Sequence, residues 1–200
     1  VQDSPTTEGT MLTSEEVFAI SKSYNQDKDW LFCDPTAGQL SSDEAIDRAI
    51  ETVKGFCEQG ILPESYANVS SLDRKAIQGT KAFAQPSELA VAPKLGCWII
   101  IFGTKVKEGS LELYLNAVTG QILQVYATYS PDLSNDFGDV SAILDQYLDY
   151  LGIDGKINAS SHWSDDSVAG YYFKDFQSGV AVKQIVNEGK ENQELIIQIS

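Results

Sequence analysis

Histidine is nearly missing from this chain of 200 residues, in which His162 is the only one. The HExxH helix of zinc hydrolases needs two histidines and is therefore excluded. The three cysteines, Cys33, Cys57 and Cys97, are far apart and form no CxxC pair, which argues against a zinc site built from thiolates. We expect free, buried thiols and neither a metal nor a cofactor; a Cys33–Cys57 disulfide is the alternative for an exported protein.

Basic residues are also scarce, with 14 against 29 acidic ones and a formal net charge of −15. Such a surface repels nucleic-acid phosphates and anionic lipid headgroups, so neither is expected as a partner. No apolar run approaches the ~18–20 residues of a membrane-spanning helix, and direct membrane insertion of this segment is not expected. The default expectation is a monomer whose partner is a protein or a cell-wall component.

What the chain does contain is enough apolar material for a true core, at 42% hydrophobic and 10% aromatic residues. Its length allows one large domain or two small ones. Residues 1–10 are rich in Ser, Thr, Pro and Glu and are expected to form a disordered tether. Such a tether is typical of the stretch after a removed signal or lipoprotein sequence, so we expect an extracellular protein or one anchored on the outer face of a membrane. An arbitrary start at residue 1 is the alternative.

The most informative stretch is 97–128, which predicts three strands and two turns. Alternation places one set of apolar side chains on one face of a hairpin, namely Leu111, Leu113, Leu115, Leu123, Val125 and Ala127. The other face carries the candidate binding surface, Glu112, Tyr114, Gln124 and Tyr126. Gly120 closes the turn, where a positive φ is commonly needed. The preceding run 98–102 is apolar on both faces and is expected to be the central strand.

The segment LELYLNAVTGQILQVYA resembles the closing hairpin of PepSY-type domains, whose turn usually reads Asp-Ala-x-Thr-Gly. Asn116 stands where the family usually has Asp, whereas Ala117, Thr119 and Gly120 match. The resemblance covers about thirty residues. It implies a secreted bacterial protein with a cystatin-like outline that binds or restrains peptidases and carries no catalytic residue of its own.

Two amphipathic helices are predicted, one in each half of the chain. The first covers 41–59, with Ser41 and Glu44 at capping-box spacing and Gly60 at its end. The second runs from Val140 to Gly152, with Asp136 and Asp139 at its start. Residues 11–24 are expected to form either a short helix or an edge strand.

The remaining segments are predicted mostly as strands. One long bent strand is expected over 67–83 and a loop over 85–93. Another loop should be anchored over the sheet by the buried side chains of Trp30, Leu31 and Phe32. In the second half we expect strands at 156–163, 168–176, 180–186 and 194–199, with the last one paired on both edges.

The fold class that follows is α+β, with two small units at 11–130 and 136–200. In each unit one helix packs on a curled antiparallel sheet, cystatin- or PepSY-like. A single domain that shares one sheet is the alternative. The aromatic cluster at 171–176 is expected to pack between the two halves.

Catalytic signals are weak. A triad of His162 with Asp165 or Asp166 and with Ser161 or Ser164 is close in sequence, but only spatial geometry defines such a site, and we favour an ordinary surface histidine. Neither a GxSxG elbow nor a phosphate-binding glycine loop occurs. The expected function is non-catalytic binding or regulation of a peptidase or cell-envelope component. The alternative is a carboxylate-dependent hydrolase with a cleft between the units, and a structural spacer is a third possibility.

Overall fold

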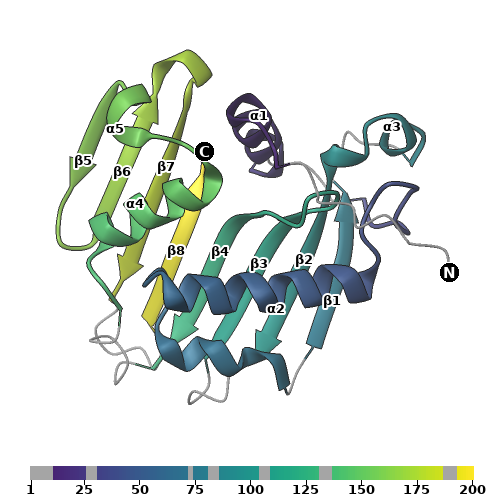
Figure 1. The fold of residues 1–200 in the computed structure, drawn as a ribbon, viewed down its shortest axis with the longest axis horizontal. Helices are drawn as coiled ribbons and strands as arrows, with labels where there is room; N and C mark the ends of the chain where they lie inside the picture. The colour runs from purple at the N-terminus through teal and green to yellow at the C-terminus, as the bar shows by residue number, and fades with distance from the viewer. Residues whose placement is uncertain are drawn as a thin grey trace, which may run out of the picture.

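A computed structural model describes most of the chain, namely residues 11–25, 31–71, 74–80, 86–103, 109–130, 137–186 and 193–200. The expected tether at 1–10 lies outside these residues, as do Trp30 and Asp136. The α+β class is confirmed: helices pack on an antiparallel sheet (Figure 1).

Eight described strands form one sheet in the order β1-β2-β3-β4-β8-β7-β6-β5. Their bounds are β1 Arg74–Thr80, β2 Gly96–Gly103, β3 Ser110–Asn116, β4 Ile122–Tyr129, β5 Ser161–Ser164, β6 Val168–Phe173, β7 Ser178–Ile185 and β8 Gln193–Ile199. The α-helices are α1 Ser14–Tyr24, α2 Ser42–Glu58, α3 Pro86–Val91, α4 Val140–Leu151 and α5 Gly155–Asn158. The 3-10 helices are η1 Glu64–Ser71, η2 Pro93–Leu95 and η4 Lys174–Phe176.

The last strand joins the two halves of the chain. β8 pairs with β4 through Val125↔Ile197 and with β7 through Val182↔Ile197, so it is bonded on both edges, as expected. Strands from both halves therefore belong to one sheet, as in the single-sheet alternative. The central strands are β4 and β8, whereas the apolar run 98–102 lies in β2, one strand from the β1 edge. The expectation that this run is central is wrong.

Each half supplies one long helix to the same face of this sheet, which we call the helix face (Figure 1). α2 lies over β1 to β3, and α4 lies over β6 and β7. The apolar side chains predicted to share one side of the hairpin point to this face and are buried: Leu111, Leu113, Leu115, Leu123, Val125 and Ala127. Side chains of the adjacent register rows point the other way, to what we call the opposite face.

Both long helices begin and end close to where the sequence predicts. Ser41 caps α2 in a reciprocal capping box with Glu44, and Gly60 follows its end with a φ of 77°. Asp139 caps α4 by accepting a hydrogen bond from the Ala142 N–H, and Gly152 ends it in the left-handed conformation. The caps satisfy terminal N–H groups that would otherwise lack partners.

α1 belongs to the first half in sequence but packs on the second half. Its Phe18 ring lies 5.0 Å from Phe173 and 4.7 Å from Phe176, centroid to centroid. At its C-terminal end the Asn25 side-chain amide donates to the Ile199 carbonyl. Of the two alternatives for residues 11–24, the helix is correct, and it closes one end of the core over the C-terminal strands.

Several predicted segments differ from the structure. Residues 155–158 form α5 rather than the start of a strand, and the predicted strand at 67–72 is largely the 3-10 helix η1. The predicted loop at 85–93 contains α3. The expected burial of Phe32 is wrong because its side chain is 56% exposed. Single-turn elements such as α5 bury too few side chains to leave a periodic pattern.

The three thiols are free, with Cys57 and Cys97 buried and Cys33 partly exposed. The Cys33–Cys57 alternative is therefore not the arrangement seen. Burial is the main cause that raises the pKa of Cys57 to about 11, so its thiolate is disfavoured at neutral pH.

Glu16 makes part of the stability pH-dependent. Its carboxylate bonds Lys94 Nζ at 2.8 Å and closes the capping box with Thr13, and these bonds lower its pKa below the usual 4.5. A lowered folded-state pKa gives stability that is present above pH 4.5 and is lost as the pH falls through the folded value. We expect Glu16→Gln to destabilise the protein at pH 7 and to match the unmodified chain near about pH 2. Urea unfolding at both pH values measures this, with exposed Glu15→Gln as the control; a difference unchanged at low pH would contradict it.

Candidate functional site

The four residues of the expected binding surface lie together on the opposite face of β3 and β4. Glu112 pairs with Tyr126 across the strands, and Tyr114 pairs with Gln124. The Tyr114 and Tyr126 rings meet edge to face at 6.3 Å between centroids. The Tyr114 hydroxyl donates to Glu112 Oε1 at 2.8 Å, and the Gln124 amide donates to the Tyr126 hydroxyl at 2.9 Å. We call these four residues the tyrosine cluster.

Burial differs within the tyrosine cluster. Gln124 is only 6% exposed, whereas the other three are half-buried. The pKa of Tyr114 is raised, mainly by burial and next by the hydrogen bond to Glu112. Its hydroxyl therefore remains a donor at neutral pH. The cluster therefore exposes parts of two fixed aromatic rings and one carboxylate, while the buried Gln124 amide holds the Tyr126 hydroxyl.

The turn that sets the register of the cluster is held by one side chain. Asn116 Oδ1 accepts hydrogen bonds from the Val118 and Thr119 N–H groups at 3.1 Å and from the Thr119 hydroxyl at 3.3 Å. An aspartate would accept these same bonds, so Asn116 can fill the turn position that is usually Asp in PepSY-type hairpins. Gly120 adopts a φ of 71°, as predicted.

α4 holds the same hairpin from the helix face. The pairing of β3 with β4 shifts by one residue after Tyr114, so the start of β4 is irregular. Side chains of α4 bond the Ile122 backbone there. The Tyr150 hydroxyl accepts from the Ile122 N–H at 2.8 Å, and the Tyr147 hydroxyl donates to the Ile122 carbonyl at 2.9 Å. Two tyrosines of the second half thus fix the strand that carries Gln124 and Tyr126.

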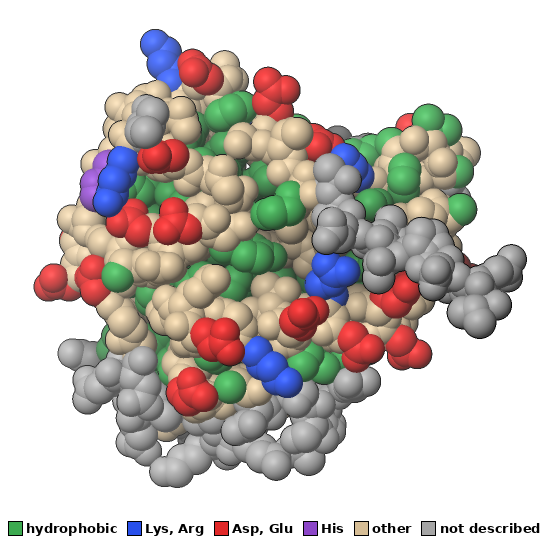
Figure 2. Space-filling view, viewed as in Figure 1, with side chains coloured by type: hydrophobic (Ala, Val, Ile, Leu, Met, Phe, Trp, Pro, Cys, Tyr) green, Lys and Arg blue, Asp and Glu red, His purple; other side chains and the backbone are tan. Residues whose placement is uncertain are grey.

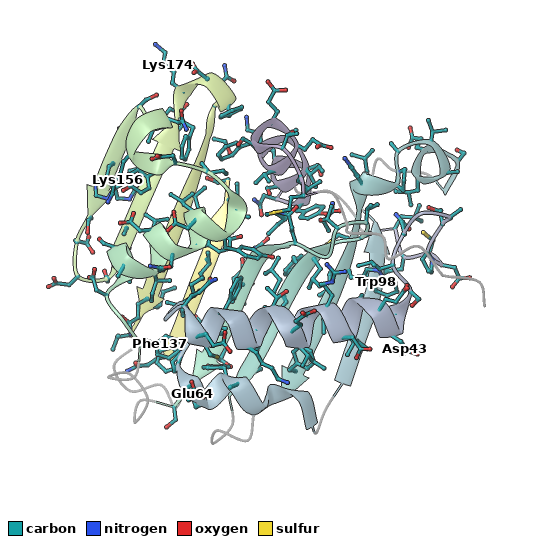
Figure 3. All side chains as sticks on the ribbon, viewed as in Figure 1. Asp43, Glu64, Trp98, Phe137, Lys156 and Lys174 are labelled. Atoms are coloured by element: carbon teal, nitrogen blue, oxygen red, sulfur yellow. The ribbon has the colours of Figure 1, made fainter. Side chains whose placement is uncertain are left out.

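A hollow of about 460 Å³ opens on the helix face of the second half, between α4, α5, β5 and β6. Its polar wall includes Asp145, which accepts from the Tyr171 hydroxyl at 3.0 Å and lies 3.9 Å from Lys156 Nζ. The His162 ring packs on Tyr171 at 4.5 Å between centroids. Figure 2 shows the purple histidine beside a blue side chain, and Figure 3 labels Lys156 at this rim. Sequence reasoning missed Asp145, Lys156 and Tyr171 as neighbours because three separate elements bring them together.

Three of the residues considered for a triad, His162, Ser164 and Asp165, have other partners. Asp165 accepts from the Ser167 and Val168 N–H groups, both at 2.8 Å, and Ser164 bonds the hydroxyl of Ser141. His162 is exposed and stacked on Tyr171. The carboxylate and one hydroxyl of that triad are thus committed to a turn and to a contact between β5 and α4.

Among the described carboxyl groups, those whose pKa departs from the usual value have a lowered pKa. Hydrogen bonds lower the pKa values of Glu16, Glu44 and Asp165. A general acid at neutral pH needs the opposite shift. Among the described residues no group of three or more His, Cys, Asp or Glu side chains is arranged to hold a metal ion. In the same part of the chain, no helix combines the length and apolar character needed to cross a bilayer.

The aromatic cluster at 171–176 divides between the two faces. Tyr171 and Phe173 are buried on the helix face, and Phe176 stacks on Phe18. Tyr172 points to the opposite face and is 39% exposed. Packing thus accounts for three of these rings but not for Tyr172.

Comparison of the chain with protein-family models, with curated proteins and with solved structures finds no match.

Proposed function

We propose that this protein is a non-catalytic binding module of the cell envelope, PepSY-like in its first half. Its tyrosine cluster contacts a peptidase or a cell-wall component outside the cytoplasm. A location outside the cytoplasm belongs to the same proposal.

The observation that carries the proposal is the convergence of two tyrosines, a carboxylate and a supporting glutamine on the opposite face. Tyrosine is enriched at binding surfaces because its ring buries area at little conformational cost while its hydroxyl keeps a partner. The rings are fixed before binding by the Glu112 and Gln124 hydrogen bonds, which reduces the entropy lost on association. The PepSY resemblance falls on the same hairpin and points to the same kind of function.

The rival function, a carboxylate-dependent hydrolase, needs two converging acids with at least one raised pKa. The hollow of about 460 Å³ has one carboxylate in its wall, Asp145, which is engaged by Tyr171 and Lys156. An adjoining smaller hollow shares Asp145 and is also lined by Asp149 and Asp154. Among the described carboxyl groups, those whose pKa departs from its usual value, Glu16, Glu44 and Asp165, have a lowered pKa. These observations favour binding over hydrolysis.

The test replaces both rings of the cluster, in the double variant Tyr114→Ala/Tyr126→Ala. Partners are isolated by pull-down from envelope fractions with the unmodified chain, and their affinities are then measured with purified components. We expect the double variant to lose at least about tenfold in affinity, because truncating a central interface tyrosine typically costs more than ~1 kcal/mol.

The matched control removes two exposed apolar side chains elsewhere, Phe32→Ala/Val186→Ala, and should leave affinity unchanged. Circular dichroism must show that both variants are folded. If every partner still binds the folded tyrosine variant at full affinity, the surface assignment is wrong. Turnover of peptide or glycoside substrates by the purified chain would instead favour the hydrolase.

A further inference from the structure

A second aromatic surface lies on the opposite face at the β5 edge of the sheet, separated from the tyrosine cluster by β8 and β7. Trp163 of β5 and Tyr172 of β6 are 44% and 39% exposed. Trp163 pairs with Gly170, and Tyr172 is two residues along β6 on the same face, so the two side chains are diagonal neighbours. A tryptophan this exposed needs an explanation, because tryptophan side chains are highly buried on average.

Gly170 makes the Trp163 ring lie flat. A Cβ built on Gly170 would be 2.2 Å from Trp163 Cζ2 and 2.5 Å from Cε2, so the six-membered ring rests directly on the glycine backbone. The far edge of the ring reaches Gly179, where a Cβ would be 4.0 Å from Cη2. One face of the indole is therefore seated on two glycines, and its other face is turned to solvent.

The residues paired directly beside the two rings are uncharged. The register places Ser161 next to Tyr172, and Gly170 next to Ala181, so small and hydroxyl side chains border the rings. Charged side chains begin one row away, with Asp165 two residues after Trp163, Lys174 two residues after Tyr172, and Lys183 paired with Val168. The Asp165 carboxylate is engaged by the Ser167 and Val168 N–H groups. Further along the Trp163 row comes the half-buried amide of Gln198, which also donates to Asn25 Oδ1 at 3.3 Å.

This combination suits an uncharged sugar. The C–H groups on one face of a pyranose carry slight positive charge and pack on the negative face of an aromatic ring, while its hydroxyls bond nearby hydroxyl and amide groups. The net charge of −15 disfavours a polyanionic polymer. A protein partner would be expected to meet a larger and more apolar patch than two rings bordered by glycine, alanine and serine.

We propose that Trp163, seated on Gly170 and flanked by Tyr172, is a stacking platform for a neutral polysaccharide. Sugar rings lie on the indole, and the chain runs across the strands toward Gln198. The platform is separate from the tyrosine cluster, so either site stands without the other.

Binding is measured by affinity electrophoresis and by tryptophan fluorescence with soluble oligosaccharides of cellulose, chitin and β-1,3-glucan, and with polygalacturonate as the anionic comparison. We expect saturable binding of at least one neutral saccharide. Trp163→Ala should weaken it at least about tenfold, because the indole supplies the stacking surface. Trp163→Tyr, which keeps a ring, should retain most of the binding.

Gly170→Ala is the sharper variant because the tryptophan remains while its seat is blocked. The added methyl meets the ring at 2.2 Å and must displace it, so binding should fall as in Trp163→Ala. The matched control is Gly55→Ala, whose methyl would meet no atom within 4 Å. Phe32→Ala removes a ring elsewhere that is more exposed than Trp163, at 56%, and should bind normally.

The proposal is overturned if no neutral saccharide binds the unmodified protein, if polygalacturonate alone binds, or if the folded Trp163→Ala and Gly170→Ala chains bind as well as the controls. Tyr114→Ala/Tyr126→Ala should leave saccharide binding intact. That variant therefore separates failure of this platform from failure of the proposed tyrosine-cluster function.

Discussion

Replacing Tyr147 by alanine is expected to lower the free energy of unfolding by about 3–5 kcal/mol, the usual range for removing a buried aromatic side chain. Tyr147 is fully buried in α4 and packs edge to face with Phe56 of α2 at 6.3 Å between centroids. Its hydroxyl also satisfies the Ile122 carbonyl at 2.9 Å. The variant thus opens a cavity between both long helices and leaves a buried carbonyl without this partner.

Tyr147→Phe separates the two contributions. It keeps the ring and removes only the hydroxyl, so a loss of about 1–3 kcal/mol is expected from the unsatisfied Ile122 carbonyl. Urea unfolding followed by circular dichroism measures both variants, and exposed Tyr172→Phe should stay within about ±0.5 kcal/mol of the unmodified chain. A loss below ~1 kcal/mol for Tyr147→Ala would show that α4 does not hold the hairpin as described.

Local signals in the sequence predict the long elements well because those elements bury one periodic stripe each. The Ser41–Glu44 box and Gly152 mark helix ends through chemistry that acts within one turn. The alternating hairpin likewise predicts which residues of β3 and β4 point away from the helices. The PepSY resemblance and the function it implies stay predictions.

Long-range pairing leaves no such local mark. Nothing in Leu195 or Ile197 distinguishes a partner in β4 from one in β7, and β8 in fact takes both. The same holds for α1, whose Phe18 meets rings more than 150 residues later. The contact of Trp163 with Gly170 is likewise not predictable from the sequence, since a glycine within a strand pattern indicates only that some group approaches the backbone closely.

The tyrosine cluster was predictable as a set because strand alternation alone places its members on one face. Its internal hydrogen bonds and the burial of Gln124 were not, since they depend on the register shift after Tyr114 and on neighbouring strands. The hollow beside Asp145 is not predictable from local patterns, because the sequence predicts a strand where α5 forms one of its walls.

The fragment 11–130, which the sequence predicts to be a separate unit, is expected not to fold by itself. Without β8, the β4 edge loses the partner strand that covers Val125 and Ala127. Without the second half, α1 loses Phe173 and Phe176, and Ile122 loses both tyrosine hydroxyls. Because whole domains are stable by only ~5–15 kcal/mol, the fragment is not expected to tolerate the loss of all these contacts together.

The fragment is compared with the chain 11–200, which keeps every described residue. We expect 11–200 to unfold in one cooperative urea transition and 11–130 to show none, with weak amide-exchange protection and self-association through its bare β4 edge. Adding the complementary fragment 137–200 should restore structure if β8 is the missing element. A cooperative transition of 11–130 alone would mean that the two halves are independent units that merely share a sheet edge, since only a complete local core gives all-or-none unfolding.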